Sequence, residues 1–164
     1  MQQTIIAKIS TLFFVLFFSV SASALTSKNQ TVEKLVQKYI HAYEDRDLNT
    51  ITHLYATNAI VIGTGKDEVI QGRKKIAASF KRDFAQSTQA TISAKKIAMS
   101  LQGNFAIASY YIMVHVKMPN STPFQSRLRL TLGLLKENNQ WVIVQSHLSA
   151  PLENQKMGES FPHA

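Results

Sequence analysis

The sequence predicts an α+β domain in which helices come first and an antiparallel sheet follows. Apolar residues recur at helical spacing as far as residue 84. From residue 90 onward they alternate with a period of two, which is typical of half-buried strands. Clusters of Gly, Pro and Asn then divide this second half into four stretches of strand length. Together these patterns predict helices packed against a meander of four long strands.

Three helices are predicted before the change of period. The first turns one apolar face inward, formed by Val32, Leu35, Val36, Tyr39, Ile40 and Tyr43. Asp47 can cap a short second helix, because its carboxylate accepts from the free amides of the first turn. Leu48, Ile51, Leu54 and Tyr55 would point inward from that helix. The third helix follows Gly72, with Ile76, Ala77, Phe80 and Phe84 inward.

Strands are predicted at residues 59–62, 91–101, 105–118, 124–136 and 141–149. The last is the most regular, and it ends before Pro151, which has no N–H to donate to a ladder. Strict alternation along it places one set of side chains on one face: Trp141, Ile143, Gln145, His147 and Ser149. That face begins apolar and ends polar, as in a strand that runs from a core into a polar cleft.

The loop between the last two strands decides which residues face each other. Arg127, Arg129 and Thr131 share one face of the preceding strand, and leucines occupy the other. A two- or four-residue turn at residues 138–139 would pair Leu130 with His147. A three- or five-residue loop, or a bulge, would bring Arg129 opposite or near His147. Because burying an unpaired guanidinium is costly, an odd loop is favoured, with Arg129 and His147 on the same face.

Residues 1–24 predict a cleavable signal peptide. Lys8 precedes an apolar run at 11–20, and the small residues Ser21-Ala22-Ser23-Ala24 follow. The run is shorter than the roughly 20 residues that span a bilayer, so a retained membrane anchor is the weaker alternative. Residues 25–151 would then form one domain and residues 152–164 a polar tail. The predicted location is the periplasm or the secreted fraction.

Composition narrows the function classes. The chain has no Cys, which excludes thiol catalysis and Cys-ligated zinc, and its net charge is +8. In an exported protein this charge favours solubility, anionic envelope surfaces or acidic small molecules over nucleic acid. His41 and Glu44 have a spacing that could ligate a metal, but no second pair accompanies them, so a solvated helix face is the preferred interpretation. No cofactor and no metal are expected.

Three segments resemble the nuclear transport factor 2-like superfamily. Residues 43–48, Tyr-Glu-Asp-Arg-Asp-Leu, with Leu54-Tyr55-Ala56, resemble the corner between helices in SnoaL-like members. Residues 72–76, Gly-Arg-Lys-Lys-Ile, resemble the start of their third helix. The pattern Trp141-x-x-Val144-x-x-His147-x-Ser149-x-Pro151 is similar to the closing strand of the calmodulin-dependent protein kinase II association domain subgroup. The resemblance implies a cone of three N-terminal helices packed on a strongly curved, mainly antiparallel sheet.

The resemblance also implies a pocket between helices and sheet. Eight residues are the ligand-binding candidates: Arg127, Arg129, Gln145 and His147 on the closing strands, Tyr39, Tyr43 and Tyr55 on the helices, and Tyr111. Tyr110 and Tyr111 are adjacent in a strand, so only one of them can line the pocket. Arg129 and His147 on one face would form an anion-binding pair. The alternative is that His147 bonds to the backbone and Arg129 pairs with a helix carboxylate.

Two functions follow. The first is an exported module that binds a small anionic or apolar ligand or assembles with itself, as a homodimer or a larger ring. Association through the outer face of the sheet is usual in the superfamily. The second is an enzyme like SnoaL or ketosteroid isomerase, acting on a small anionic or carbonyl compound with His147 as acid/base. Isomerase-like members carry a carboxylate base on the first short strand, where this chain has Ile60-Val61-Ile62-Gly63. This departure favours the first function.

Overall fold

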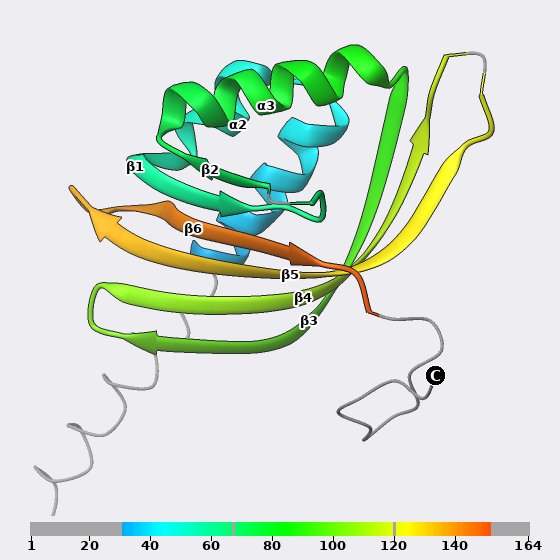
Figure 1. The fold of residues 1–164 in the computed structure, drawn as a ribbon. Coiled ribbons are helices and arrows are strands. Elements are labelled where there is room, and N and C mark those ends of the chain that lie inside the picture. The colour runs from blue at the N-terminus through cyan, green and yellow to red at the C-terminus, as the bar shows by residue number, and fades with distance from the viewer. Residues whose placement is uncertain (1–30, 67, 120, 152–164) are drawn as a thin grey trace, which may run out of the picture.

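The computed structural model describes residues 31–66, 68–119 and 121–151. The predicted signal peptide at 1–24 and the polar tail at 152–164 lie outside these residues. Helices pack into the concave side of a strongly curved sheet (Figure 1). The sheet has six strands in the order β2-β1-β6-β5-β4-β3. The predicted α+β cone is therefore confirmed.

The helices lie close to their predicted positions. The first covers residues 31–44 of the described chain, α2 spans Leu48–His53 and α3 spans Arg73–Gln86. Asp47 caps α2 as predicted, since its carboxylate accepts from the Thr50 N–H at 2.9 Å. Tyr55 was expected to end the second helix, but it begins the first strand instead. Its side chain still points inward and is buried.

The strands are β1 (Tyr55–Ile62), β2 (Val69–Gln71), β3 (Gln89–Gln102), β4 (Phe105–Lys117), β5 (Phe124–Glu137) and β6 (Gln140–Ser149). The four long strands begin and end within two residues of the predicted bounds. All neighbours in the sheet are antiparallel except β1 and β6, which run parallel. The hairpin of β4 and β5 curves up beside the C-terminal end of α3 (Figure 1).

The corner between the first helix and α2 holds the helical layer in place. Arg46 has a positive φ of 58°, and its guanidinium donates to the carbonyl oxygens of Phe84, in the last turn of α3, and of Thr88, which follows the helix. The Phe84 carbonyl has no partner within the helix, because the Thr88 N–H donates to Lys117 instead, and the cation satisfies it. Glu44 accepts from the Ile92 N–H of β3 at 2.6 Å. The corner thus joins the first helix to both α3 and the sheet.

The loop of the β5–β6 hairpin differs from the predicted one. Asn138 and Asn139 form a two-residue turn with positive φ angles of 47° and 65°, as type I′ turns require. The odd loop is therefore wrong. The register shifts at a point away from the turn: Leu134 pairs with Ile143, whereas Gly133 pairs with Gln145. Val144 is the extra residue of a β-bulge, and this bulge restores the parity that the odd loop was expected to supply.

The bulge also corrects the strict alternation predicted for β6. Trp141 and Ile143 are buried before the bulge, and Ser146 is buried after it, opposite Leu132. One extra residue rotates the strand, so both apolar halves of β6 face the helices. The polar residues Gln145, His147 and Ser149 consequently point to the outer face. The expectation of a strand running from the core into a polar cleft is wrong.

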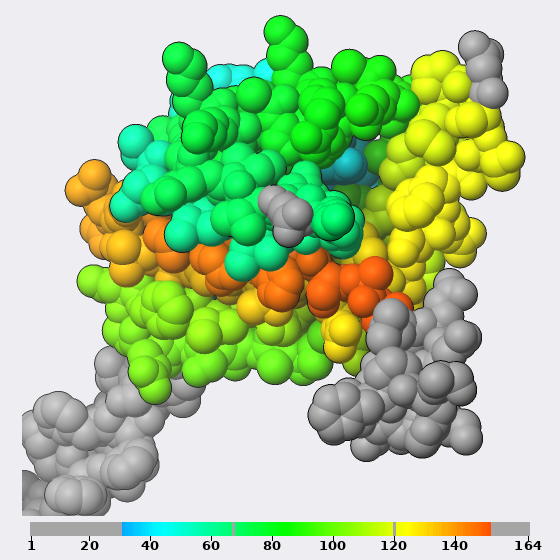
Figure 2. Space-filling model, in the orientation of Figure 1, coloured from blue at the N-terminus to red at the C-terminus, as the bar shows by residue number. Residues whose placement is uncertain are grey.

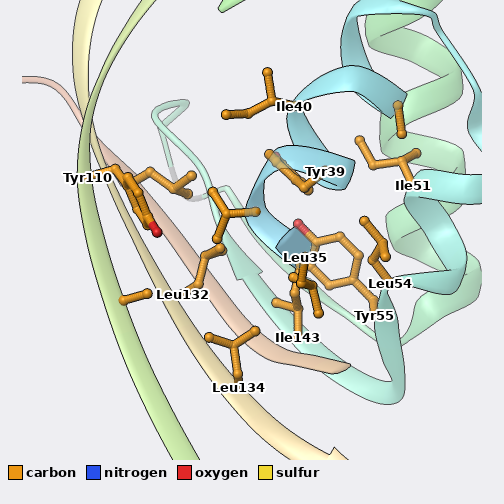
Figure 3. Close-up of a cluster of buried hydrophobic side chains, with 14 of the residues drawn as sticks. Leu35, Tyr39, Ile40, Ile51, Leu54, Tyr55, Tyr110, Leu132, Leu134 and Ile143 are labelled. Atoms are coloured by element: carbon orange, nitrogen blue, oxygen red, sulfur yellow. The ribbon is translucent and has the colours of Figure 1, made fainter. Parts of the chain in front are cut away.

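The core lies between the helices and the concave face of the sheet. Figure 3 shows Tyr55 near the helices and Tyr110 on the sheet side of this cluster. Its largest fully buried side chains include Ile51, Ile76, Leu130, Leu132 and Leu134. Among the residues described, no helix is long and apolar enough to cross a membrane.

Candidate functional site

A cavity of about 220 Å³ lies between the helices and the concave face of the sheet. Its roof comes from the first helix and α3, through Tyr39, Ile40, Tyr43, Ile76, Phe80 and Asp83. Its floor is formed by apolar residues of β3 to β6, including Ile92, Ile112, Leu128, Leu130 and Leu148. In Figure 2 the surface is hollowed between α3 and the β4–β5 hairpin, where part of the first helix is visible. The curvature of the sheet leaves this space beside the packed core.

Aromatic rings form much of the roof. Phe80 of α3 contacts Tyr39 and Tyr43 edge to face, with ring centroids 6.4 Å and 6.2 Å apart. Tyr39 in turn meets Tyr55 of β1 at 6.4 Å in the same geometry. Such contacts position rings more strictly than apolar contact alone. The rings therefore present a fixed aromatic surface to anything that enters.

The floor carries one buried pair of hydroxyls. The Tyr55 hydroxyl and the Ser146 Oγ lie 3.2 Å apart, within hydrogen-bond distance. Burial raises the pKa of Tyr55 to about 12, although its hydrogen bonds with Ser146 and Tyr39 act in the opposite direction. Burial also raises the pKa of Tyr39 well above its usual range. Both phenols therefore keep their protons at neutral pH and can donate hydrogen bonds.

Two carboxylates line the cavity, and neither was among the residues predicted from the sequence. Asp83 belongs to α3, and Glu68 belongs to the loop that joins β1 to β2. Arg82 bridges them, with Nη2 2.9 Å from Asp83 Oδ1 and 3.2 Å from Glu68 Oε1. Burial raises the pKa of Asp83, and the bonds from Arg82 offset this only in part.

The inward position of Asp83 could have been predicted from the sequence. It follows Ile76 by seven residues and Phe80 by three, so it lies on the inward stripe of α3. A carboxylate on an apolar stripe is unusual, because its burial costs free energy. Glu68 has no such signal, since it occupies a loop whose path only the folded chain defines.

The three predicted helix-side tyrosines line the cavity, namely Tyr39, Tyr43 and Tyr55. The other five candidates lie on the opposite face of the sheet: Arg127, Arg129, Gln145, His147 and Tyr111. The prediction that these five side chains line the cavity is therefore wrong. Leu128 and Leu130 alternate with the arginines, and these leucines are the side chains turned toward the helices. Exposing the guanidinium groups to water avoids the cost of burying them.

On the outer face the predicted neighbours do come together. Thr131 pairs directly with His147, and Arg129 pairs with Ser149. Arg129 and His147 thus share a face and are diagonal neighbours, as the parity argument required. Arg127 stacks over the ring of Tyr111, with its guanidinium carbon 4.6 Å from the ring centroid. His147 cannot act as an acid or base in the cavity, because the sheet separates them.

Tyr110 takes the inward position that was assigned to Tyr111. It is buried against the core, and its hydroxyl has no hydrogen-bond partner within the described chain. His41 and Glu44, the pair with metal-like spacing, are 3.7 Å apart, and the His41 side chain is 69% exposed. The described ranges contain no group of three or more His, Cys, Asp or Glu residues placed to hold a metal ion.

Comparisons with solved structures agree with this fold. A candidate scytalone dehydratase from Novosphingobium aromaticivorans matches with a TM-score of 0.75 and 9% identity, over 80% of this chain and 89% of that one. A nuclear transport factor 2-like protein from Salmonella enterica serovar Typhimurium matches with a TM-score of 0.73 and 18% identity, over 84% and 99%. A candidate calcium/calmodulin-dependent protein kinase II association domain from Xanthomonas campestris matches with a TM-score of 0.67 and 19% identity, over 74% and 86%.

At these identities the structural matches show the fold alone. A search of curated proteins returned no match. The family comparison is more direct, because the model of the SnoaL-like domain matches residues 32–153, which include nearly all the described chain. The chain therefore belongs to the SnoaL-like domain family, within the nuclear transport factor 2-like superfamily.

Proposed function

We propose that this protein binds a small, largely apolar molecule in the cavity beneath α3. The supporting observation is the cavity itself, with an aromatic roof, an apolar floor and a few polar groups at defined places. This combination is typical of small-molecule sites. An engineered apolar cavity of roughly 150 Å³ accommodates benzene. The volume of about 220 Å³ therefore suits a molecule of one or two rings.

The charges at the cavity favour the apolar ligand over the anionic one. Among the described residues, the cavity lining includes Asp83 and Glu68 but no Lys, Arg or His. An anion would therefore approach two carboxylates with no facing cation except Arg82, which already binds both. The arginines that suggested an anionic ligand point away from the cavity.

A blocking substitution tests the proposal. Ser79 lines the cavity from α3, whereas its neighbour Ala78 is exposed on the other side of the helix. Binding of the neutral fluorophore 2-naphthylmethanol would be followed by its emission in the wild type and in two variants. Ser79→Phe should abolish the binding by filling the cavity, and the matched control Ala78→Phe should retain it. Equal binding by all three proteins would refute the proposal.

A second candidate function is catalysis in the same cavity. The favouring observation is Asp83, a partly buried carboxylate whose raised pKa suits a general base better than an ordinary aspartate. Turnover of small hydroxylated or carbonyl compounds would be screened in wild-type protein, Asp83→Asn and His147→Ala. Catalysis at this site requires Asp83→Asn to remove turnover and His147→Ala to leave it intact.

We also propose that the chain forms a homodimer through the apolar end of the outer sheet face. Phe105, Ile107 and Leu135 are 42%, 43% and 36% exposed there. Phe105 and Leu135 are directly paired across β4 and β5, so the exposed groups are contiguous. One of the similar structures is named as an association domain, which supports self-assembly. A larger ring is the alternative that size measurements would reveal.

Export remains part of the proposal and rests on residues 1–24. N-terminal sequencing of the protein recovered from a periplasmic or culture fraction should begin at Leu25. A cell-associated product that begins at Met1 would contradict export with cleavage.

A further inference from the structure

The residues that line the cavity carry a negative charge in a chain whose net charge is +8. Asp83 and Glu68 contribute two carboxylates, and Arg82 contributes the guanidinium that bridges them. We propose that the cavity selects an organic cation, an apolar ring bearing an amine, whose ammonium group binds Asp83. This inference rests on the proposed function, since it names the class of ligand for the same cavity.

The bonding of Asp83 leaves one of its oxygens for a ligand. Arg82 donates from Nε at 3.1 Å and from Nη2 at 2.9 Å, and both bonds go to Oδ1. Within the part of the chain that the structure describes, no hydrogen bond reaches Oδ2. The Arg82 side chain is 53% exposed, so it neutralises the carboxylate from the solvent side. An ammonium group inside the cavity would complete the pairing from the other side.

Glu68 adds a second carboxylate from the loop between β1 and β2. Its Oε2 accepts from the Gly65 N–H at 3.1 Å, so the side chain folds back over its own loop. A Cβ at position 63 would lie 1.9 Å from the same oxygen, so Gly63 leaves room for the Glu68 side chain in this position. The loop holds Glu68 toward Arg82, where one guanidinium is shared by two carboxylates.

The aromatic roof suits a cation as well as an apolar ring. Tyr43 and Phe80 line the cavity together with Asp83, and their rings meet edge to face. A cation near an aromatic face is attracted by the negative charge of the π system. The proximity of Asp83 contributes to the raised pKa of Tyr43, after the larger effect of burial. Since Tyr43 and Asp83 line the same cavity, one ammonium group in it can meet both the ring and the carboxylate.

Three ligands with the same ring test the inference: 2-naphthylmethylamine, 2-naphthylmethanol and 2-naphthoate. They differ chiefly in the charge of the head group. We expect the amine to bind at least about tenfold more tightly than the alcohol, because hydrogen bonds between charged groups are the stronger kind. The naphthoate should bind most weakly. Dissociation constants would be measured by calorimetry at one pH and one ionic strength.

Variants assign the preference to Asp83. Asp83→Asn should remove the preference for the amine, so that the dissociation constants of amine and alcohol become about equal in this variant. Asp45→Asn is the matched control, because Asp45 is exposed and does not line the cavity. It should leave all three affinities unchanged. Arg82→Gln removes the competing cation and should tighten the binding of the amine.

The outcomes separate the inference from the proposed function. Equal binding of amine and alcohol would overturn the inference and keep the apolar site. The inference would also be overturned if the naphthoate bound most tightly. The same holds if Asp45→Asn and Asp83→Asn lost equal affinity for the amine. If none of the three compounds binds the wild-type protein, the proposed function fails, and this inference with it.

Discussion

The hydroxyls of Tyr55 and Ser146 lie 3.2 Å apart, and both side chains are fully buried. Tyr55 begins β1 and Ser146 lies in β6, so this bond joins the only parallel pair of strands within the described sheet. Ser146 reaches the inner face only because the bulge at Val144 precedes it. The same hydroxyls belong to the floor of the cavity.

Removing one partner of this bond should destabilise the protein. Tyr55→Phe and Ser146→Ala should each lower the free energy of unfolding by about 1–3 kcal/mol, because each removes the hydrogen bond between the two buried hydroxyls. The double variant should lose less than the sum of the two, since both single variants already lose the same shared bond. Urea denaturation of the four proteins measures this coupling. Strictly additive losses would show that the bond does not contribute.

Asp83 should make stability depend on pH. Its folded pKa is raised above the ordinary 3.8, mainly by burial, so folding favours the protonated form. The stability it contributes is full below pH 3.8 and is lost as pH rises through the raised folded pKa. Asp83→Asn should lack this decline, so its stability relative to the wild type should increase across that window. Chemical denaturation at a series of pH values compares the two proteins, and parallel curves would contradict the prediction.

The β5–β6 turn should require residues that tolerate positive φ. Asn139 has a φ of 65°, in the left-handed region that Ala adopts at a cost of roughly 1–2 kcal/mol. Asn139→Ala should therefore lower the free energy of unfolding by about 1 kcal/mol, since Asn itself tolerates this region better. Asn139→Gly is the control and should retain or increase stability. Thermal denaturation of both variants gives the comparison, and an Ala variant as stable as the Gly variant would oppose the argument.

A charge on the apolar end of the outer face should prevent self-association. Leu135→Glu places a carboxylate beside Phe105, its partner across β4 and β5. If a second copy covers this face, the charge would be buried without a partner and the protein should become monomeric. Val69→Glu serves as the control, since Val69 is exposed on β2 at the far edge of the sheet. Light scattering should then give the wild-type mass for Val69→Glu. A dimer that persists in Leu135→Glu would exclude this interface.

Much of the fold could be predicted because its signals are local. The period of two set the long strands to within two residues, and Asp47 marked the start of α2. The boundary at Tyr55 was missed because a buried aromatic residue suits the end of a helix and the start of a strand equally well. Here packing in the core, rather than local preference, decided its conformation.

The candidate site was predicted only in part. Tyr39 and Tyr43 line the cavity because helical spacing turns them inward, and Tyr55 lines it from the start of β1. Arg129 and His147 were placed correctly relative to each other but on the wrong face. Parity along a strand relates side chains to one another, and it does not say which face meets the helices.

The sequence by itself determined the α+β order, the long strands and the aromatic face of the helices, because each depends on periodicity within a short segment. Only the tertiary structure decided the bulge at Val144, the outward direction of His147 and the convergence of Asp83 with Glu68. A bulge changes register by one residue, and the free energy of burying Trp141, Ile143 and Leu148 on one face selects it. That energy belongs to the packed molecule and not to the strand alone.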